Sequence, residues 1–210
     1  MKLQGDLEVE IARVWAGQND GAHDIWHLRR VWANCSRIAD QLDRDVDRDV
    51  LLIASYLHDI VNLPKDDARR KDAADLSAQH AIAWMTQRAL PDAQAVAYAI
   101  RAHSYSANAP CQTLEAQILQ DADRLEALGA IGIARCFNVA GQMGAGLVHG
   151  GDPLAQARAL DDHAYALDHF ETKLFGIAKT LNTAPAQQMA TQRMEVMRAF
   201  VAQLVDEATV

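Results

Sequence analysis

The sequence predicts an all-α protein, and three observations support this fold class. Half of the 210 residues are hydrophobic, but only 6% are aromatic. Ala and Leu dominate the apolar residues and lose little side-chain freedom in a helix, whereas the β-branched and aromatic residues that favour strands are sparse. Apolar residues also recur at spacings of three and four, which is the helical period. We therefore expect a single-domain bundle of about eight helices, because a chain of this length can bury one substantial core.

The expected helices follow from this spacing and from the Gly and Pro residues between the periodic segments. They are residues 7–16, 23–39, 50–61, 73–89, 91–103, 114–137, 163–181 and 186–208. The sixth is expected to be one long helix with a possible break near residues 129–132. Residues 17–21 and 142–153 are rich in Gly and predict loops. In this scheme the core motifs lie in residues 23–130, and the C-terminal helices within 160–208 pack on them.

The segment VLLIASYLHDIV, residues 50–61, is apolar almost all round. A helix of this composition is buried on all sides rather than along one stripe, so we expect it at the centre of the bundle. Pro64 is expected to end it, because the residue before a proline is pushed out of helical geometry.

The charge and cysteine content exclude several classes of protein. The 28 acidic and 20 basic residues leave a formal charge of −8, which opposes broad attraction to nucleic acid or anionic lipid. Three widely spaced Cys residues do not form a disulfide framework or a zinc ribbon. The first residues lack the basic start and apolar run of a signal peptide, and no apolar stretch reaches membrane-spanning length. We expect a cytoplasmic protein without nucleic-acid or membrane partners, and no oligomeric state is predicted.

His58 and Asp59 interrupt the most apolar segment of the chain. A buried, unpaired carboxylate is costly, so this pair needs partners. A local hydrogen bond or helix cap is the ordinary explanation for such a pair. Adjacent residues on a helix diverge by about 100°, so both can bind one ion only if other helices contribute ligands.

Candidate partners occur on two other predicted helices. His23 and His27 are four residues apart and share one helical face, but Asp24 stands where the zinc-protease motif requires Glu. Asp121 and Asp123 point to nearly opposite sides of their helix, so at most one can face a shared ion. A mixed set of imidazole and carboxylate ligands suits Mn, Fe, Co, Ni or Mg better than a thiolate zinc site would.

These residues occur in an order that resembles the HD superfamily of metal-dependent phosphohydrolases, specifically one bacterial branch of it. The resemblance covers about residues 20–205. The motifs that carry it are HLRRV at His27, LHD at His58 and Asp59, IRAHS at 100–104, the run at 115–135 that contains DADRL at Asp123, and HFETKLF at 169–175.

The resemblance implies that His27, His58, Asp59 and Asp123 bind one divalent ion, with Mn favoured among Mn, Mg, Co, Ni and Fe, and with a second ion as an alternative. It also implies that a metal-activated water cleaves a phosphate ester or phosphoanhydride bond in a small molecule, expected to be a nucleotide. The apolar stripe of residues 114–128 would instead place Asp121 inward. Asp121 is therefore kept as the alternative ligand or as a group that supports the ligands.

The resemblance also suggests further catalytic residues. Asp59 is expected to take part in catalysis as well as in metal binding. Asp24 would orient the water or His58, or it would cap its own helix. His103, in the family's I-x-x-H-S pattern, would donate to a phosphate oxygen or act as a general acid.

Basic residues near these motifs are candidates for binding phosphate. Lys65, Arg69 and Arg70 follow the His-Asp pair closely, and Arg and Lys are the usual phosphate ligands. Lys173 in the C-terminal motif would also reach phosphate. The alternatives are a solvated basic surface for the first three and, for Lys173, a stem that covers apolar neighbours.

Two other functions remain open from the sequence. One is a catalytically silent HD domain that senses a nucleotide without turnover. The other is a di-iron relative with oxygenase-type chemistry, which needs additional histidine and carboxylate ligands between the His-Asp pair and the last Asp. His80 and His103 are available for that role.

Overall fold

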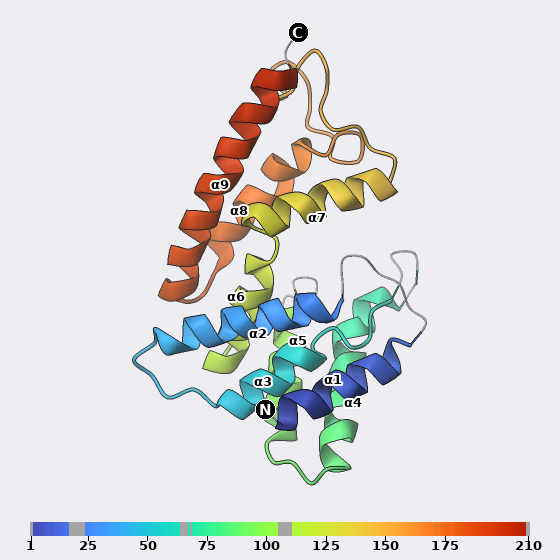
Figure 1. Cartoon of the computed structure of the whole chain (residues 1–210), viewed down its shortest axis with the longest axis vertical. Helices are drawn as coiled ribbons and strands as arrows, with labels where there is room; N and C mark the ends of the chain where they lie inside the picture. Colours follow the sequence, from blue (N-terminus) through green and yellow to red (C-terminus); the bar gives the residue numbers. More distant parts are fainter. Residues whose placement is uncertain (1, 17–23, 64–66, 68, 105–110, 209–210) are drawn as a thin grey trace. The chain divides into compact units, whose positions relative to one another are not determined.

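The computed structural model describes residues 2–16, 24–63, 67, 69–104 and 111–208. Across these residues the regular structure is helical, with one isolated bridge between Gly146 and Tyr165 and no strand, which confirms the all-α prediction. The chain divides into two compact units, residues 1–123 and 124–210 (Figure 1). The expectation of one domain with the C-terminal helices packed on the core motifs stays a prediction. No helix in the described ranges has the length and apolar character needed to cross a membrane.

The first unit is built around α3, the helix that the sequence places at the centre. Buried side chains cover nearly its whole length, and α3 contacts α1, α2, α4 and α5. In chain order the elements are α1 (Lys2–Val14), α2 (Ile25–Asp40), α3 (Arg48–Leu57), the 3₁₀ turn η1 (Arg70–Asp72), α4 (Ala73–Thr86), α5 (Ala93–His103) and α6 (Leu114–Leu125), whose last two residues fall in the second unit.

The end of α3 differs from the prediction, because the helix stops at Leu57 rather than at residue 61. The Ser55 carbonyl accepts a hydrogen bond from Nδ1 of His58 at 2.8 Å, and the Ile60 N–H donates to the carbonyl three residues back, at 3.3 Å. The histidine ring thus takes an acceptor that a continuing helix would use. His58 and Asp59 lie in the turn after the helix, and Pro64 lies outside the described residues.

The buried face of α2 has the helical spacing. Leu28, Val31, Cys35 and Ile38 are fully buried at intervals of three and four residues. The helix starts at Ile25, after Asp24, whose carboxylate accepts from the His27 N–H at 2.8 Å. The side chain satisfies a backbone donor that the first helical turn leaves without a partner.

The expected long helix at 114–137 is two helices, α6 and α7 (Gly129–Gln142), separated by residues 126–128. Gly129 has a φ of 72°, a left-handed conformation that costs glycine little. A Cβ at Gly132 would overlap the carbonyl of Ala127. The two glycines permit a sharp turn that other residues would resist, and the break at residues 126–128 directly precedes the predicted interval 129–132.

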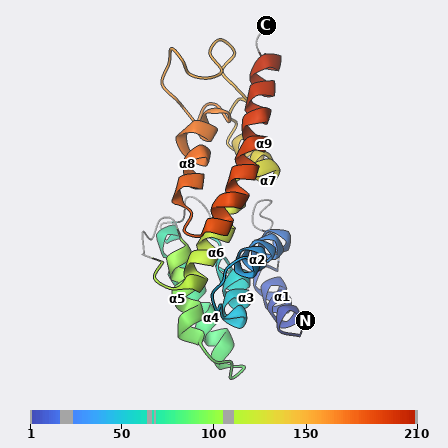
Figure 2. The same cartoon turned by 90° about the vertical axis from the view of Figure 1, so that its left-hand side faces the viewer.

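Four phenylalanines of the second unit form a cluster of ring contacts. Its elements after α7 are the π-helical turn η2 (Phe170–Leu174), α8 (Phe175–Ile177), the 3₁₀ turn η3 (Ala178–Thr180) and α9 (Ala184–Ala208), shown from a second side in Figure 2. The rings of Phe137, Phe170, Phe175 and Phe200 have neighbouring centroids 5.7 to 6.2 Å apart. Of the four rings only that of Phe170 is fully buried, and α7 and α9 contact each other in this unit.

The helix predicted at 163–181 is wrong in its first part. Residues 163–167 form turns and a bridge, and the helical part begins at Asp168 and continues to Thr180, partly with π and 3₁₀ geometry. The buried carboxylate of Asp168 accepts from both terminal nitrogens of Arg158, at 2.6 and 2.7 Å, and from the Asp161 N–H at 2.7 Å. These contacts hold residues 158–168 in a compact turn, which competes with continuous helix.

Candidate metal centre

Five side chains of the first unit form two overlapping groups of potential metal ligands. One contains His27, His58 and Asp123, and the other contains His58, Asp59 and His103. Within each group the ligand atoms lie within 4.8 Å of one another. His27 lies on α2, and His58 and Asp59 lie in the turn after α3. His103 ends α5, and Asp123 lies on α6, so four separate segments meet at this centre.

The distances within the centre are those expected of donors around a shared ion. Nε2 of His27 lies 3.5 Å from Oδ1 of Asp123, and Nε2 of His58 lies 3.8 Å from the same oxygen. Asp59 places Oδ2 3.5 Å from Nε2 of His58 and Oδ1 3.7 Å from Nε2 of His103. Ligands about 2.1 Å from one ion are themselves about 3 to 4 Å apart. His58 is the residue that both groups share.

Two of the histidines are oriented in the same way. His58 directly follows α3, and its Nδ1 bonds to the Ser55 carbonyl three residues earlier. His103 ends α5, and its Nδ1 bonds to the Ile100 carbonyl, also three residues earlier. A carbonyl only accepts, so the hydrogen must be on Nδ1, and neutral Nε2 carries a lone pair. Nε2 of His58 is buried and makes no hydrogen bond in the described part of the chain. A buried nitrogen of this kind fits a metal ligand.

Burial and neighbouring charges set the ionisation of the centre. Burial lowers the pKa of His58 to about 4, although the carboxylate of Asp59 acts in the opposite direction. Burial also lowers the pKa of His103, but Asp59 outweighs it and the net shift is upward. Burial would raise the pKa of Asp59, yet the imidazoles of His58 and His103 hold it well below its usual range. His58 is thus neutral and Asp59 ionised near neutral pH, which are the forms that bind metal.

Two buried amides that the sequence analysis did not identify hold the centre together. Nδ2 of Asn34 on α2 donates to the carbonyl of Ala122 at 3.3 Å, and Nε2 of Gln120 donates to the carbonyl of Ala102 at 2.9 Å. The acceptors directly precede Asp123 and His103 in the chain. The sequence signal that could have identified Asn34 and Gln120 is a polar residue among the apolar positions of an amphipathic helix.

Replacing Asn34 by alanine should weaken binding of Mn²⁺ about tenfold without removing a ligand, because α6 loses a bond next to Asp123. The carbonyl left without this donor should also lower the free energy of unfolding by about 1 to 3 kcal/mol. Calorimetric titration with Mn²⁺ and urea unfolding measure the two effects.

Gln41→Ala is the matched control, because the Gln41 amide donates to the Arg37 carbonyl at the exposed end of the same helix. That variant should change neither quantity appreciably. Unchanged metal affinity in a destabilised Asn34→Ala protein would restrict Asn34 to a role in stability.

The two aspartates of the DADRL motif occupy different environments. Asp121 is fully buried, as the apolar stripe predicts, but it belongs to neither ligand group. Asp123 belongs to the first group, with 31% of its side chain exposed. Asp24 also belongs to neither group and caps α2, the structural alternative considered for it, and its role in catalysis stays a prediction.

The predicted phosphate-binding residues are placed only in part. Arg69 is paired with Asp67 at 2.8 Å, and the hydrogen bonds from Arg69 lower the pKa of Asp67 to about 2. Arg70 donates to the carbonyl of Leu63 at 3.1 Å. Lys65, like His23, lies outside the described residues, and Lys173 is exposed on η2 in the second unit. Their contacts with a substrate stay predictions.

His80 bears on the di-iron alternative. Its Nε2 lies 2.8 Å from Oε1 of Glu10, a buried carboxylate on α1, and His80 belongs to neither ligand group. Of the two additional histidines considered for that alternative, only His103 is at the centre.

Comparison with known proteins identifies relatives that match almost the whole length of this chain. The family model of the HD domain matches residues 25–128, which contain all five residues of the centre. The uncharacterized protein YpgQ of Bacillus subtilis (strain 168) is 30% identical over 206 residues, which cover 94% of this chain and 92% of the relative.

Solved structures agree with this match. The crystal structure of Bacillus subtilis YpgQ in complex with ADP has a TM-score of 0.74 and 27% identity, and the match covers 97% of both chains. An HD-superfamily hydrolase from Bacillus thuringiensis has a TM-score of 0.68 and 28% identity, with 98% of this chain and 97% of that chain covered. HD domains bind divalent metal ions, and the His and Asp residues described above provide a ligand set of that kind. The chain therefore belongs to the HD superfamily, whose solved relatives include hydrolases.

Proposed function

We propose that the protein is a divalent-metal-dependent phosphohydrolase that cleaves a phosphate ester or phosphoanhydride bond in a nucleotide. The observation that carries this proposal is the buried Nε2 of His58, which makes no hydrogen bond in the described residues and faces carboxylates of Asp59 and Asp123. The ADP complex of YpgQ supports a nucleotide as the substrate class.

His27, His58, Asp59 and Asp123 would hold the ion. The nearby thiol of Cys35 does not compete, because burial and the carboxylates of Asp123 and Asp121 raise its pKa and keep it protonated. The donors are therefore nitrogen and oxygen, a set that suits Mn and the similar divalent ions. When bound, such an ion lowers the pKa of a water molecule and offsets negative charge on a phosphoryl oxygen.

The protein's own groups would orient the reactants. Asp59 faces both His58 and His103 and would accept a hydrogen bond from the attacking water. His103 already donates Nδ1–H to the Ile100 carbonyl, so a second proton would reside on Nε2. We assign that proton to the leaving oxygen, which makes His103 the general acid.

The test is hydrolysis by the purified full chain after removal of metal with a chelator. Protein resupplied with Mn²⁺, Mg²⁺, Co²⁺, Ni²⁺ or Fe²⁺ should release phosphate or pyrophosphate from at least one member of a panel of nucleoside mono-, di- and triphosphates and simple phosphate esters. The products identify the bond cleaved. Nucleotide binding without release under every metal would instead support the silent sensor, and iron-dependent consumption of oxygen would support the di-iron alternative.

A further inference from the structure

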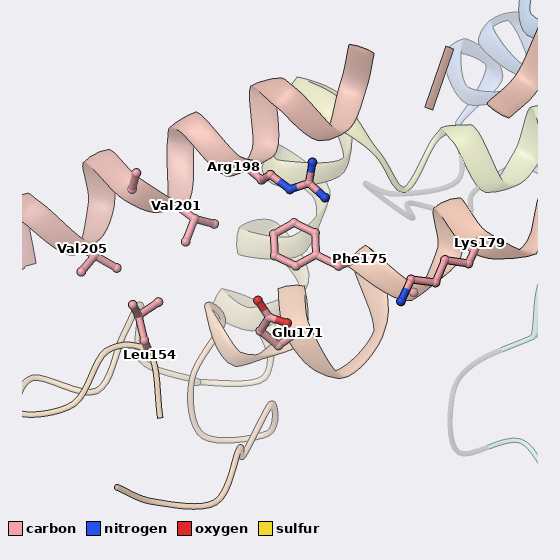
Figure 3. Close-up of a pocket in the computed structure, with 9 residues that line it drawn as sticks. Leu154, Glu171, Phe175, Lys179, Arg198, Val201 and Val205 are labelled. Atoms are coloured by element: carbon pink, nitrogen blue, oxygen red, sulfur yellow. The ribbon is translucent and has the colours of Figure 1, made fainter. Parts of the chain in front are cut away.

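The second unit contains a pocket of about 610 Å³ that is separate from the residues of the metal centre. It lies between the segment from η2 to η3 and one face of α9, with Leu154 from the preceding irregular segment at its edge (Figure 3). Pockets of about 300 to 1,000 Å³ are typical of small-molecule sites.

The two ends of the pocket differ in chemistry. Leu154, Val201 and Val205 form an apolar end, and Lys179 lies on the other side of the Phe175 ring (Figure 3). Arg198 extends from α9 towards the same ring. Arg198, Val201 and Val205 are spaced by three and four residues, so they share one helical face.

The cations of this pocket differ from the paired arginines elsewhere in the molecule. Arg29 and Arg158 each bind a carboxylate with two nitrogens. Among the described residues, Arg198 and Lys179 have no such carboxylate partner. Glu171 also lines the pocket, one helical turn before Phe175, and leaves the lining with one net positive charge.

We propose that this pocket binds a small amphipathic anion. Its apolar body would lie against Val201, Val205 and Phe175, and its single carboxylate or phosphate group would lie between Arg198 and Lys179. One net positive charge suits a single carboxylate or phosphate group, with one to two negative charges, better than a polyphosphate. The proposal does not rest on the proposed hydrolase activity, because it uses none of the residues of the metal centre.

The proposal can be tested on the full chain by calorimetric titration with octanoate and with octyl phosphate, in the presence of a chelator that prevents hydrolysis. The two probes distinguish a carboxylate from a phosphate ligand. At least one should bind saturably, and octanamide, the neutral analogue of octanoate, should bind about tenfold more weakly because it lacks the charge. Arg198→Gln and Lys179→Gln should each reduce the affinity about tenfold.

Arg135→Gln is the matched control, because it removes a cation from the same unit outside the pocket lining. It should leave the affinity unchanged, and circular dichroism verifies that each variant is folded. Absence of saturable binding at millimolar probe would overturn the proposal. So would equal affinity for octanamide, or an affinity that Arg198→Gln and Lys179→Gln both leave intact.

Discussion

The Asp59→Ala variant should hydrolyse the best substrate of the wild type about a thousandfold more slowly or not at all. Asp59 is the carboxylate of the second ligand group, with one oxygen 3.5 Å from His58 and the other 3.7 Å from His103. Its loss removes a proposed ligand of the ion, which is also the proposed partner of the water and of the general acid. Several kcal/mol of transition-state stabilisation correspond to about this factor. Phosphate release under saturating Mn²⁺ measures it.

Asp75→Ala controls for the loss of one negative charge. Asp75 is 62% exposed on α4 and pairs with Arg101 at 2.7 Å, so its replacement should leave the rate unchanged. Titration with Mn²⁺ should show weaker binding by the Asp59 variant alone. Activity equal to wild type in Asp59→Ala, or in His58→Ala, would disprove the proposed site.

The Asp168→Asn variant should lower the free energy of unfolding of the second unit by about 3 kcal/mol. The Asp168 side chain is 1% exposed and its partner Arg158 is 17% exposed. The substitution keeps the shape but leaves the guanidinium mostly buried without its counter-charge. Asp40→Asn is the matched control, because Asp40 and Arg48 form an exposed ion pair, and its effect should be below about 1 kcal/mol.

The four tryptophans, Trp15, Trp26, Trp32 and Trp84, all lie in the first unit, so their fluorescence does not report on Asp168 directly. Hydrogen exchange of the amides in residues 158–177 is the appropriate measurement. Exchange in Asp168→Asn should be faster there, while fluorescence-detected unfolding of the first unit stays close to wild type. Unchanged exchange would show that the ion pair contributes little.

The same ion pair predicts a dependence on pH. Hydrogen bonds from Arg158, and one from the Asp161 N–H, hold the pKa of Asp168 below its usual range despite burial. The unfolded carboxyl has the higher pKa, about 3.9, so the contribution to stability is present above that pH and is lost as the pH falls through the lower, folded value. The difference in exchange between wild type and Asp168→Asn should therefore shrink as the pH falls below about 4.

Much of the fold was predictable because it depends on local patterns. The periodic segments are helices, and the apolar run around residues 50–57 is the buried α3. The order of the motifs also selected His27, His58, Asp59 and Asp123 as candidates, and the structure brings them to one centre through two overlapping groups.

The remaining features depend on partners that are remote in sequence or on competition for backbone acceptors. Periodicity correctly placed Asp121 in the interior but did not reveal that Asp123 faces His27 on another helix. The amide contacts of Asn34 and Gln120 span 88 and 18 residues, so no local pattern identifies their acceptors.

The sequence by itself determined the helical class of this protein and the residue types available to bind a metal, because both follow from local composition and spacing. Tertiary structure alone decided where the His58 ring lies. The ring bonds locally to the Ser55 carbonyl, which replaces helical geometry with a turn, and packing brings Nε2 close to the carboxylates of Asp59 in the same turn and of Asp123 on α6. The physical reason is that a buried polar atom takes its partners from whichever segments pack around it, and periodicity does not specify those segments.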